Sequence, residues 1–215
     1  MRILPFSDAS LAEAISLLRT GAVIAHATET CYGLACDLTN PDAVARLFAI
    51  KDRPLLQPVS ALFSSADDAK RYVIWSDRVE ELAKEYLPGP LTLILPLRSD
   101  APCILHPTVK IQDSRSKKQI TSNEQRATIG VRVSSHPVAR ALVTAFVSPL
   151  STTSANLHGQ QNPYSAEEIV RQFEGREYQP DLILDSGTLP PNPPSTVVDL
   201  AKGNAATLRQ GKIGL

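Results

Sequence analysis

The chain has 215 residues, of which 43% are apolar and 20% are charged, so it is long enough to bury one sizeable core and is expected to form a single domain. Lysine plus arginine equal aspartate plus glutamate at 22 each, which excludes the global basic field that attracts nucleic acid. No apolar run approaches the roughly 20 residues of a membrane-spanning helix, so we expect no membrane partner. Three cysteines without metal-ligand spacing, and no apolar leader, favour a reducing, cytoplasmic setting.

Hydrophobic periodicity predicts helices and strands along the whole length. The expected helices run from a cap at Asp8 or Ser10 to Gly21, from Pro41 to before Pro54, at about 77–87, from Pro137 through Val143, and from a capping box at Ser165 and Glu168 through Phe173. The expected strands are 22–26, 91–95, 128–133, 181–185 and 195–200. Because these elements mix without a regular βαβ repeat, the pattern predicts an α/β fold with one twisted mixed sheet and packed helices.

A run of six small hydroxyl or amide side chains, Ser151 to Asn156, directly follows an apolar stretch. A core strand has little use for so many short polar groups, so we expect either a loop or a surface that holds a polar ligand. Similar polar clusters recur at 28–30, 51–53 and 195–196. We interpret the four clusters as walls of one pocket.

The predicted strand at 128–133 alternates strictly between apolar and other residues. Because strand side chains point to opposite faces in turn, Thr128 and Arg132 share the face away from the core, with Gly130 between them. A cation and a hydroxyl beside a residue without a side chain predict a slot for an anionic or zwitterionic ligand. An internal salt bridge to Arg132 is the structural alternative.

Familiar ligand motifs are missing. The sequence has no G-x-G-x-x-G after a strand, no Walker A loop, no zinc-ligand spacing and no G-x-S-x-G. If a nucleotide binds, arginines, hydroxyls and backbone N–H groups must hold it.

The segment 110–126 is basic and poor in apolar residues. It is expected to be a mobile loop: a lid over a phosphate site, a contact for a nucleic acid or a partner protein, or solvated surface. We favour the lid, because a charged loop beside phosphates can become ordered on binding.

Seven motifs resemble, in order and spacing, the YrdC-like family of L-threonylcarbamoyladenylate synthases over nearly the whole chain. They are Thr28-Glu29-Thr30-Cys31-Tyr32-Gly33-Leu34, Lys51-Asp52-Arg53-Pro54, Pro88-Gly89-Pro90-Leu91-Thr92, Gly130-Val131-Arg132, Ser154-Ala155-Asn156, Ser195-Thr196-Val197 and Leu208-Arg209. The resemblance implies an open twisted sheet of parallel and antiparallel strands. It also implies one YrdC-like domain over residues 1–215, without the additional C-terminal domain of longer members.

The implied activity converts L-threonine, bicarbonate and ATP into threonylcarbamoyl-AMP with release of pyrophosphate. A downstream tRNA-modifying transferase complex then passes the group to the adenosine at position 37 of tRNA, giving t6A. Weak tRNA binding by the chain itself is a further expectation. The resemblance also implies Mg²⁺ bound through the ATP phosphates, because no carboxylate pair marks a protein-bound metal.

The resemblance assigns roles to twelve residues. The candidate catalytic residues, which also contact the triphosphate, are Lys51 and Arg53. The residues expected to bind L-threonine are Arg132, at the carboxylate, with Thr30, Thr152 and Ser195. The remaining residues expected at the ATP site are Gln57, Thr128, Ser154, Asn156, Asn162 and Arg209, with Asn156 ordering the turn.

Simpler interpretations remain for these residues. Lys51 and Arg53 could only complement a helix dipole, Ser154 and Asn156 could be turn formers, and Glu29 is either a base or structural. The cysteines and histidines are expected to be structural or surface residues. For the whole chain, an RNA-binding module of the same fold without this activity is the alternative, as is a relative with another substrate.

Three positions depart from the family pattern. Ala27 replaces a proline, Gln57 replaces an asparagine, and Leu62 replaces a histidine that contacts threonine in some members. Selectivity for threonine is therefore the assignment that the resemblance supports least.

Overall fold

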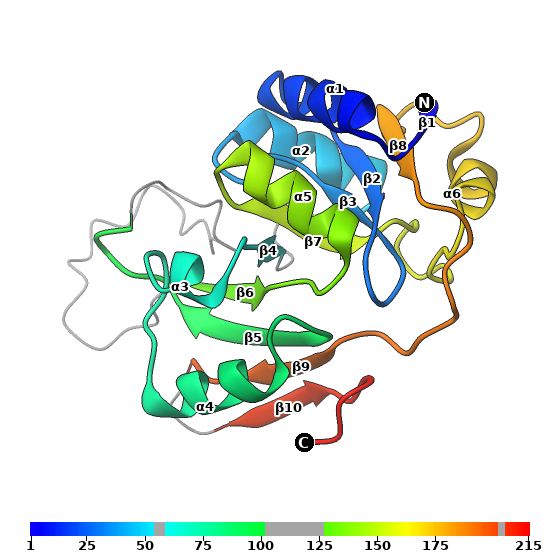
Figure 1. Ribbon diagram of the computed structural model, residues 1–215. Coiled ribbons are helices and arrows are strands. Elements are labelled where there is room, and N and C mark those ends of the chain that lie inside the picture. The colour runs from blue at the N-terminus through cyan, green and yellow to red at the C-terminus, as the bar shows by residue number, and fades with distance from the viewer. Residues whose placement is uncertain (54–58, 102–126, 202–204) are drawn as a thin grey trace, which may run out of the picture.

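The computed structural model describes residues 1–53, 59–101, 127–201 and 205–215 (Figure 1). The strands are β1 Arg2–Pro5, β2 Ile24–Ala27, β3 Tyr32–Ala35, β4 Ser60–Leu62, β5 Leu91–Pro96, β6 Thr128–Arg132, β7 Leu150–Ser154, β8 Leu182–Asp185, β9 Thr196–Asp199 and β10 Ala206–Arg209. The helices are α1 Asp8–Arg19, α2 Pro41–Ile50, α3 Ala66–Ala69, α4 Asp77–Tyr86, α5 Pro137–Phe146 and α6 Ala166–Phe173. The basic segment 110–126 and its proposed lid lie outside the described residues.

The strands form one mixed sheet in the order β1-β8-β2-β3-β7-β4-β6-β5-β9-β10. Four neighbouring pairs are parallel, namely β1/β8, β2/β8, β4/β6 and β5/β9. The other five pairs are antiparallel, namely β2/β3, β3/β7, β4/β7, β5/β6 and β9/β10. The predicted twisted mixed α/β sheet is therefore confirmed.

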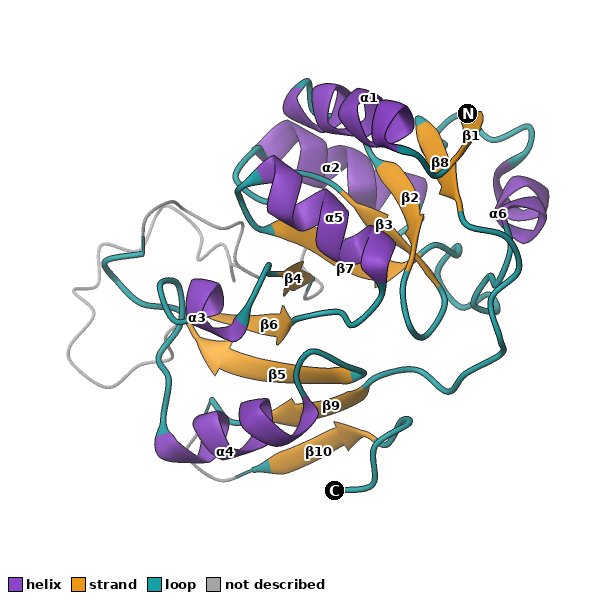
Figure 2. Cartoon of the chain, in the orientation of Figure 1, coloured by secondary structure: helices purple, strands orange, loops and turns teal. Residues whose placement is uncertain are grey.

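Helices cover the two faces of the sheet unequally (Figure 2). The helices α1 and α5 contact one another and bury their apolar stripes with Ile24 of β2, Leu150 of β7 and Leu184 of β8. The helices α2, α4 and α6 contribute to the larger core with the side chains of the opposite face, such as Leu93 and Val131. Period-two alternation along each strand assigns side chains to one face or the other.

The helix ends follow the sequence signals with two corrections. Ser7, rather than Asp8 or Ser10, caps α1, because its hydroxyl accepts from Ser10 N at 3.2 Å while Ser10 Oγ accepts from Ser7 N at 2.9 Å. Ser165 does cap α6 by accepting from Glu168 N at 3.3 Å. The Glu168 carboxylate, however, accepts from Tyr164 N and not from the cap residue, so the predicted capping box is incomplete.

The polar run after residue 150 is a strand, which corrects the expectation that it avoids strand structure. Ser151 to Ser154 lie in β7, in the middle of the sheet between β3 and β4. Their backbone groups belong to ladders on both sides, so the short polar side chains do not prevent strand pairing. No helix among the described residues is long and apolar enough to span a membrane.

Candidate active site

The helices α1 and α5 cover only part of one face of the sheet. A pocket lies on the uncovered part of that same face. Along β7, Leu150 packs under these helices, and the same-face residues Thr152 and Ser154 line the pocket. Along β4, Leu62 packs under them and Ser60 lines the pocket. On both strands, a leucine occupies the position under the helices, and a hydroxyl residue occupies the position that no helix covers.

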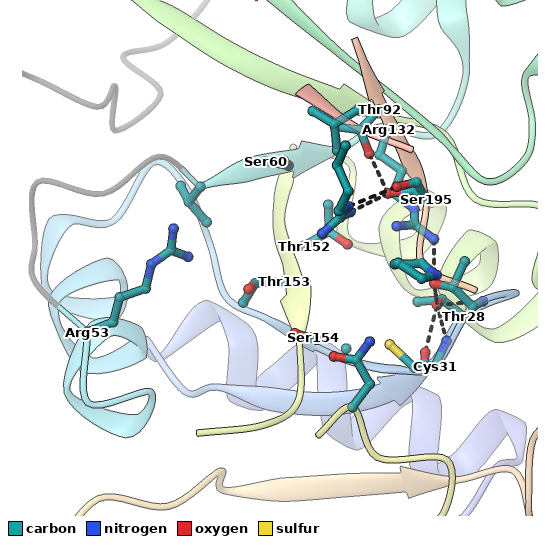
Figure 3. A pocket seen from close by; sticks show the side chains of 17 residues that line it. Thr28, Cys31, Arg53, Ser60, Thr92, Arg132, Thr152, Thr153, Ser154 and Ser195 are labelled. Carbon is teal, nitrogen blue, oxygen red and sulfur yellow. Dashed lines mark hydrogen bonds between the residues drawn. The ribbon is translucent and has the colours of Figure 1, made fainter. Parts of the chain in front are cut away.

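The pocket has a volume of about 230 Å³ and joins segments that are far apart in the sequence. The lining residues are Thr28, Thr30, Cys31, Gly33, Arg53, Val59, Ser60, Thr92, Arg132, Thr152, Thr153, Ser154, Asn162, Pro194, Ser195, Val197 and Arg209. Figure 3 shows Arg53 on one side of the pocket and Arg132 with Ser195 on the other, with residues 152–154 between them. All four predicted walls therefore contribute to one pocket, as expected.

Arg132 lines the pocket and is also held from behind by an internal ion pair. Its Nη2 donates to Glu29 Oε1 at 2.7 Å and to Thr30 Oγ1 at 2.9 Å. Its Nε is buried and has no hydrogen-bond partner among the described residues. The internal salt bridge is therefore confirmed, and it orients a guanidinium that lines the pocket, while anion binding by Arg132 stays a prediction.

Glu29 is the partner that the sequence could not assign. It accepts from Arg132 and from the Ser134 hydroxyl, and although burial alone would raise the pKa of its carboxyl, these contacts hold that pKa below its ordinary value. Glu29 is absent from the pocket lining. A carboxylate held ionised by two donors suits a residue that orients Arg132 better than it suits a general base.

A second arginine is fixed at the same pocket by the chain's C-terminal strand. Arg209 of β10 donates through Nε to Ser195 O at 3.1 Å and through Nη2 to Ser195 Oγ at 3.0 Å. Ser195 Oγ also lies 3.0 Å from Thr92 Oγ1. Burial, and the nearby Arg132 charge, lower the pKa of Arg209, but a guanidinium remains charged at neutral pH.

The two cations after α2 have different surroundings. Arg53 lines the pocket, and its guanidinium lies 5.8 Å from the centre of the Phe48 ring. Lys51 is not among the lining residues. Its buried Nζ donates to Ser154 O at 2.5 Å, Asn156 O at 2.8 Å and Asn156 Oδ1 at 3.1 Å.

Lys51 therefore holds the turn that follows β7. Burial, with the Arg53 charge as the second cause, lowers the pKa of Lys51 to about 7, whereas its three oxygen acceptors favour the charged form. In this structure the Lys51 ammonium stabilises residues 154 and 156 from the protein side of the pocket wall. Ser154, and not Lys51, lines the pocket.

Three further predicted residues have other positions. Asn156 is buried behind the wall, where its Oδ1 accepts from Ser154 Oγ at 2.6 Å, which agrees with its predicted role in ordering the turn. Thr128 is the first residue of β6, opposite Pro96, and is not part of the lining. Gln57 lies outside the described residues.

The predicted slot over Gly130 is filled by neighbouring side chains. A Cβ atom on Gly130 would lie 2.3 Å from Ser60 Oγ and 3.2 Å from the Thr92 methyl group. Gly130 is thus required because Ser60 and Thr92 pack over it, and the ligand space lies beyond them.

Sequence reasoning gave no role to several lining residues, including Ser60 and Thr92. Thr92 belongs to the Pro88-Gly89-Pro90-Leu91-Thr92 motif, so a signal was present. Ser60 lies on a three-residue strand without any pattern of its own, so only the sheet could reveal it.

The lining is chemically suited to anions. Among the described residues it has three guanidinium groups and many hydroxyls but no aspartate or glutamate. No group of three or more His, Cys, Asp or Glu side chains with metal-binding geometry occurs among the described residues. The pocket can thus offset the negative charge of a phosphorylated or carboxylate ligand, but its walls offer no carboxylate to a metal ion.

The chain has an open mixed sheet with arginines and hydroxyls on its uncovered face. This arrangement is typical of a protein that binds an anionic small molecule. The chain belongs to the Sua5/YciO/YrdC family, whose profile carries the description "Telomere recombination" and matches residues 16–211. A Vibrio cholerae protein named threonylcarbamoyl-AMP synthase is 33% identical over 205 residues, covering 94% of this chain and 97% of the relative.

Solved structures agree with this membership. The Pyrococcus abyssi Sua5 structure with L-threonine has a TM-score of 0.80 at 28% identity, covering 98% of this chain and 56% of that one. The E. coli YciO structure has a TM-score of 0.76 at 27% identity, covering 98% and 93%. The present chain therefore spans little more than half of the P. abyssi chain.

Proposed function

We propose that the protein is an L-threonylcarbamoyladenylate synthase that uses L-threonine, bicarbonate and ATP. The observation that carries the proposal is the meeting of Arg53, Arg132 and Arg209 at one pocket with hydroxyls between them. Relatives named threonylcarbamoyl-AMP synthase favour this activity over an RNA-binding module. The lining residues that the structure describes also include no tryptophan, tyrosine or phenylalanine, on which single-stranded bases would stack.

The reaction joins two anions, so positioning and charge compensation are its first demands. The threonine amine attacks carbon dioxide derived from bicarbonate and loses a proton, which forms the carbamate. A carbamate oxygen then attacks the α-phosphorus of ATP, and the bond to the β-phosphate oxygen breaks to release pyrophosphate.

The residues divide between the two substrates. Arg132, with Thr30 beside it, holds the threonine carboxylate through the part of its guanidinium that lines the pocket. Arg53, on the opposite side of the pocket, binds the phosphates and offsets charge on the transferring phosphoryl group. Ser154, Asn162 and Arg209 also contact ATP, and Arg209 reaches it from the Arg132 side of the pocket, where Ser195 orients it.

Mg²⁺ and the downstream partners belong to the same proposal. The described part of the lining has no carboxylate, so the ion would be held by the phosphates of ATP and would neutralise them there. The adenylate would pass to a transferase complex that makes t6A in tRNA. A cytoplasmic setting and weak tRNA binding stay predictions.

The test is to incubate the purified protein with ATP, bicarbonate and radiolabelled L-threonine and to measure the adenylate and pyrophosphate. We expect product that requires all three substrates and that is lost in Arg53→Ala and Arg132→Ala. Arg140→Ala, on the exposed side of α5, is the matched control and should retain activity. Tight RNA binding without pyrophosphate above background would instead support the binding module.

A further inference from the structure

The hydroxyls of the pocket fall into two groups. Some are already used inside the protein: Thr28 and Thr30 contact one another near Arg132, and Thr92 and Ser195 contact one another near Arg209. Ser60 Oγ, Thr152 Oγ1 and Thr153 Oγ1, in contrast, have no hydrogen bond to any other described residue, although all three residues line the pocket. These three hydroxyls can therefore turn to a ligand without breaking an internal bond, and Ser60 and Thr152 are the two that share a face of the sheet.

The sheet places two of the unused hydroxyls, those of Ser60 and Thr152, side by side. Ser60 pairs with Thr152 across the antiparallel β4/β7 ladder, so their side chains are direct neighbours on one face, with Cβ atoms about 5 Å apart. Ser60 also pairs with Gly130 across β4/β6, and its Oγ extends over that glycine. The absence of a side chain at Gly130 is what makes room for the Ser60 hydroxyl.

The pair lies between the charged groups that hold the ends of the substrates. Figure 3 shows Thr152 between Arg53 on one side and Arg132 on the other. An amino acid with its carboxylate at Arg132 and its amino group directed toward the phosphates at Arg53 must lie over β4 and β7. Its side chain then meets the strand positions that present Ser60 and Thr152.

We propose that Ser60, together with Thr152, recognises the side-chain hydroxyl of the amino-acid substrate and so makes the pocket selective for a hydroxyl amino acid. This inference rests on the proposed function. A site built to hydrogen-bond a substrate hydroxyl rejects an isostere that lacks it, because the site's polar groups are then left unpaired. Valine is that isostere of threonine.

The experiment compares L-threonine with L-valine in wild type, Ser60→Ala and Ser60→Cys, by adenylate kinetics and by calorimetric binding. We expect both variants to lower the threonine-to-valine ratio of kcat/KM by about tenfold or more, through a higher KM for threonine. The KM for ATP should not change. Ser60→Cys keeps the size of the side chain, so it separates loss of the hydroxyl from loss of volume.

Ser99→Ala, at an exposed position outside the pocket, is the matched control and should keep the wild-type ratio. An unchanged ratio in the folded Ser60→Ala protein would overturn the assignment, and so would a rise in the KM for ATP alone. If the wild type makes no adenylate, the proposed function fails, whereas the ratio of the threonine and valine dissociation constants still tests Ser60.

Discussion

Replacing Lys51 with methionine separates a structural role from a ligand-binding role. Methionine retains most of the apolar stem but removes the ammonium that donates to two backbone carbonyls and one amide oxygen of residues 154 and 156. Each buried polar group left without a partner costs about 1–3 kcal/mol. Part of this cost is offset because the buried ammonium no longer has to be desolvated. We expect a net loss of about 2–4 kcal/mol in the free energy of unfolding.

The assay is urea denaturation without any ligand, with Lys84→Met as the matched control. Lys84 is exposed, and its Nζ lies 3.4 Å from Glu80 Oε1, so its replacement should change the free energy of unfolding by less than about 1 kcal/mol. Activity of Lys51→Met should also fall, because Ser154 loses its support. If Lys51→Met unfolds at the same urea concentration as Lys84→Met while ATP binding is lost, the ammonium belongs to the ligand site and our placement is refuted.

Further predictions concern two glycines and one histidine. Gly130→Ala should raise KM for threonine and destabilise the fold by about 1–3 kcal/mol, because its Cβ would lie 2.3 Å from Ser60 Oγ and 2.9 Å from Ser60 Cβ; wild-type kinetics and a wild-type midpoint of unfolding would contradict this. Gly211→Ala should destabilise the fold by about 1–3 kcal/mol, because its Cβ would lie 2.1 Å from Pro194 O, and wild-type stability in urea would exclude that packing. Burial lowers the pKa of His26 to about 4, so the unfolded chain binds an extra proton between its ordinary pKa of 6.5 and 4. Stability should therefore decrease by about 3 kcal/mol as the pH falls through this window, and His26→Leu should remove most of that decrease in pH-dependent unfolding.

The regular elements could be read from the sequence because periodicity is a local property. The strict alternation from Thr128 to Arg132 predicted β6, and Pro41 and Pro137 begin the helices that they were expected to begin. The short elements β1, β4 and α3 could not be predicted in the same way. A segment of three or four residues, such as Ser60–Leu62, is too brief to show a period.

The site could be predicted in part because its residues lie in recognisable motifs. Arg53, Arg132 and Arg209 were expected at one pocket and are found there. The roles of Lys51 and Glu29 depended on partners more than 100 residues away in the chain, namely Asn156 and Arg132. No local sequence pattern indicates that Arg53 lines the pocket whereas Lys51 is hydrogen-bonded inside the protein.

The sequence by itself determined the periodic elements, the order of the polar motifs and the family to which those motifs point. The tertiary structure alone decided which strands are neighbours, and so which polar side chains meet. Inserting β4 between β7 and β6 brings Ser60 beside Thr152 and over Gly130, across about 70 to 90 residues of chain. Pairing at that distance depends on the packing of the whole sheet, which no single segment encodes.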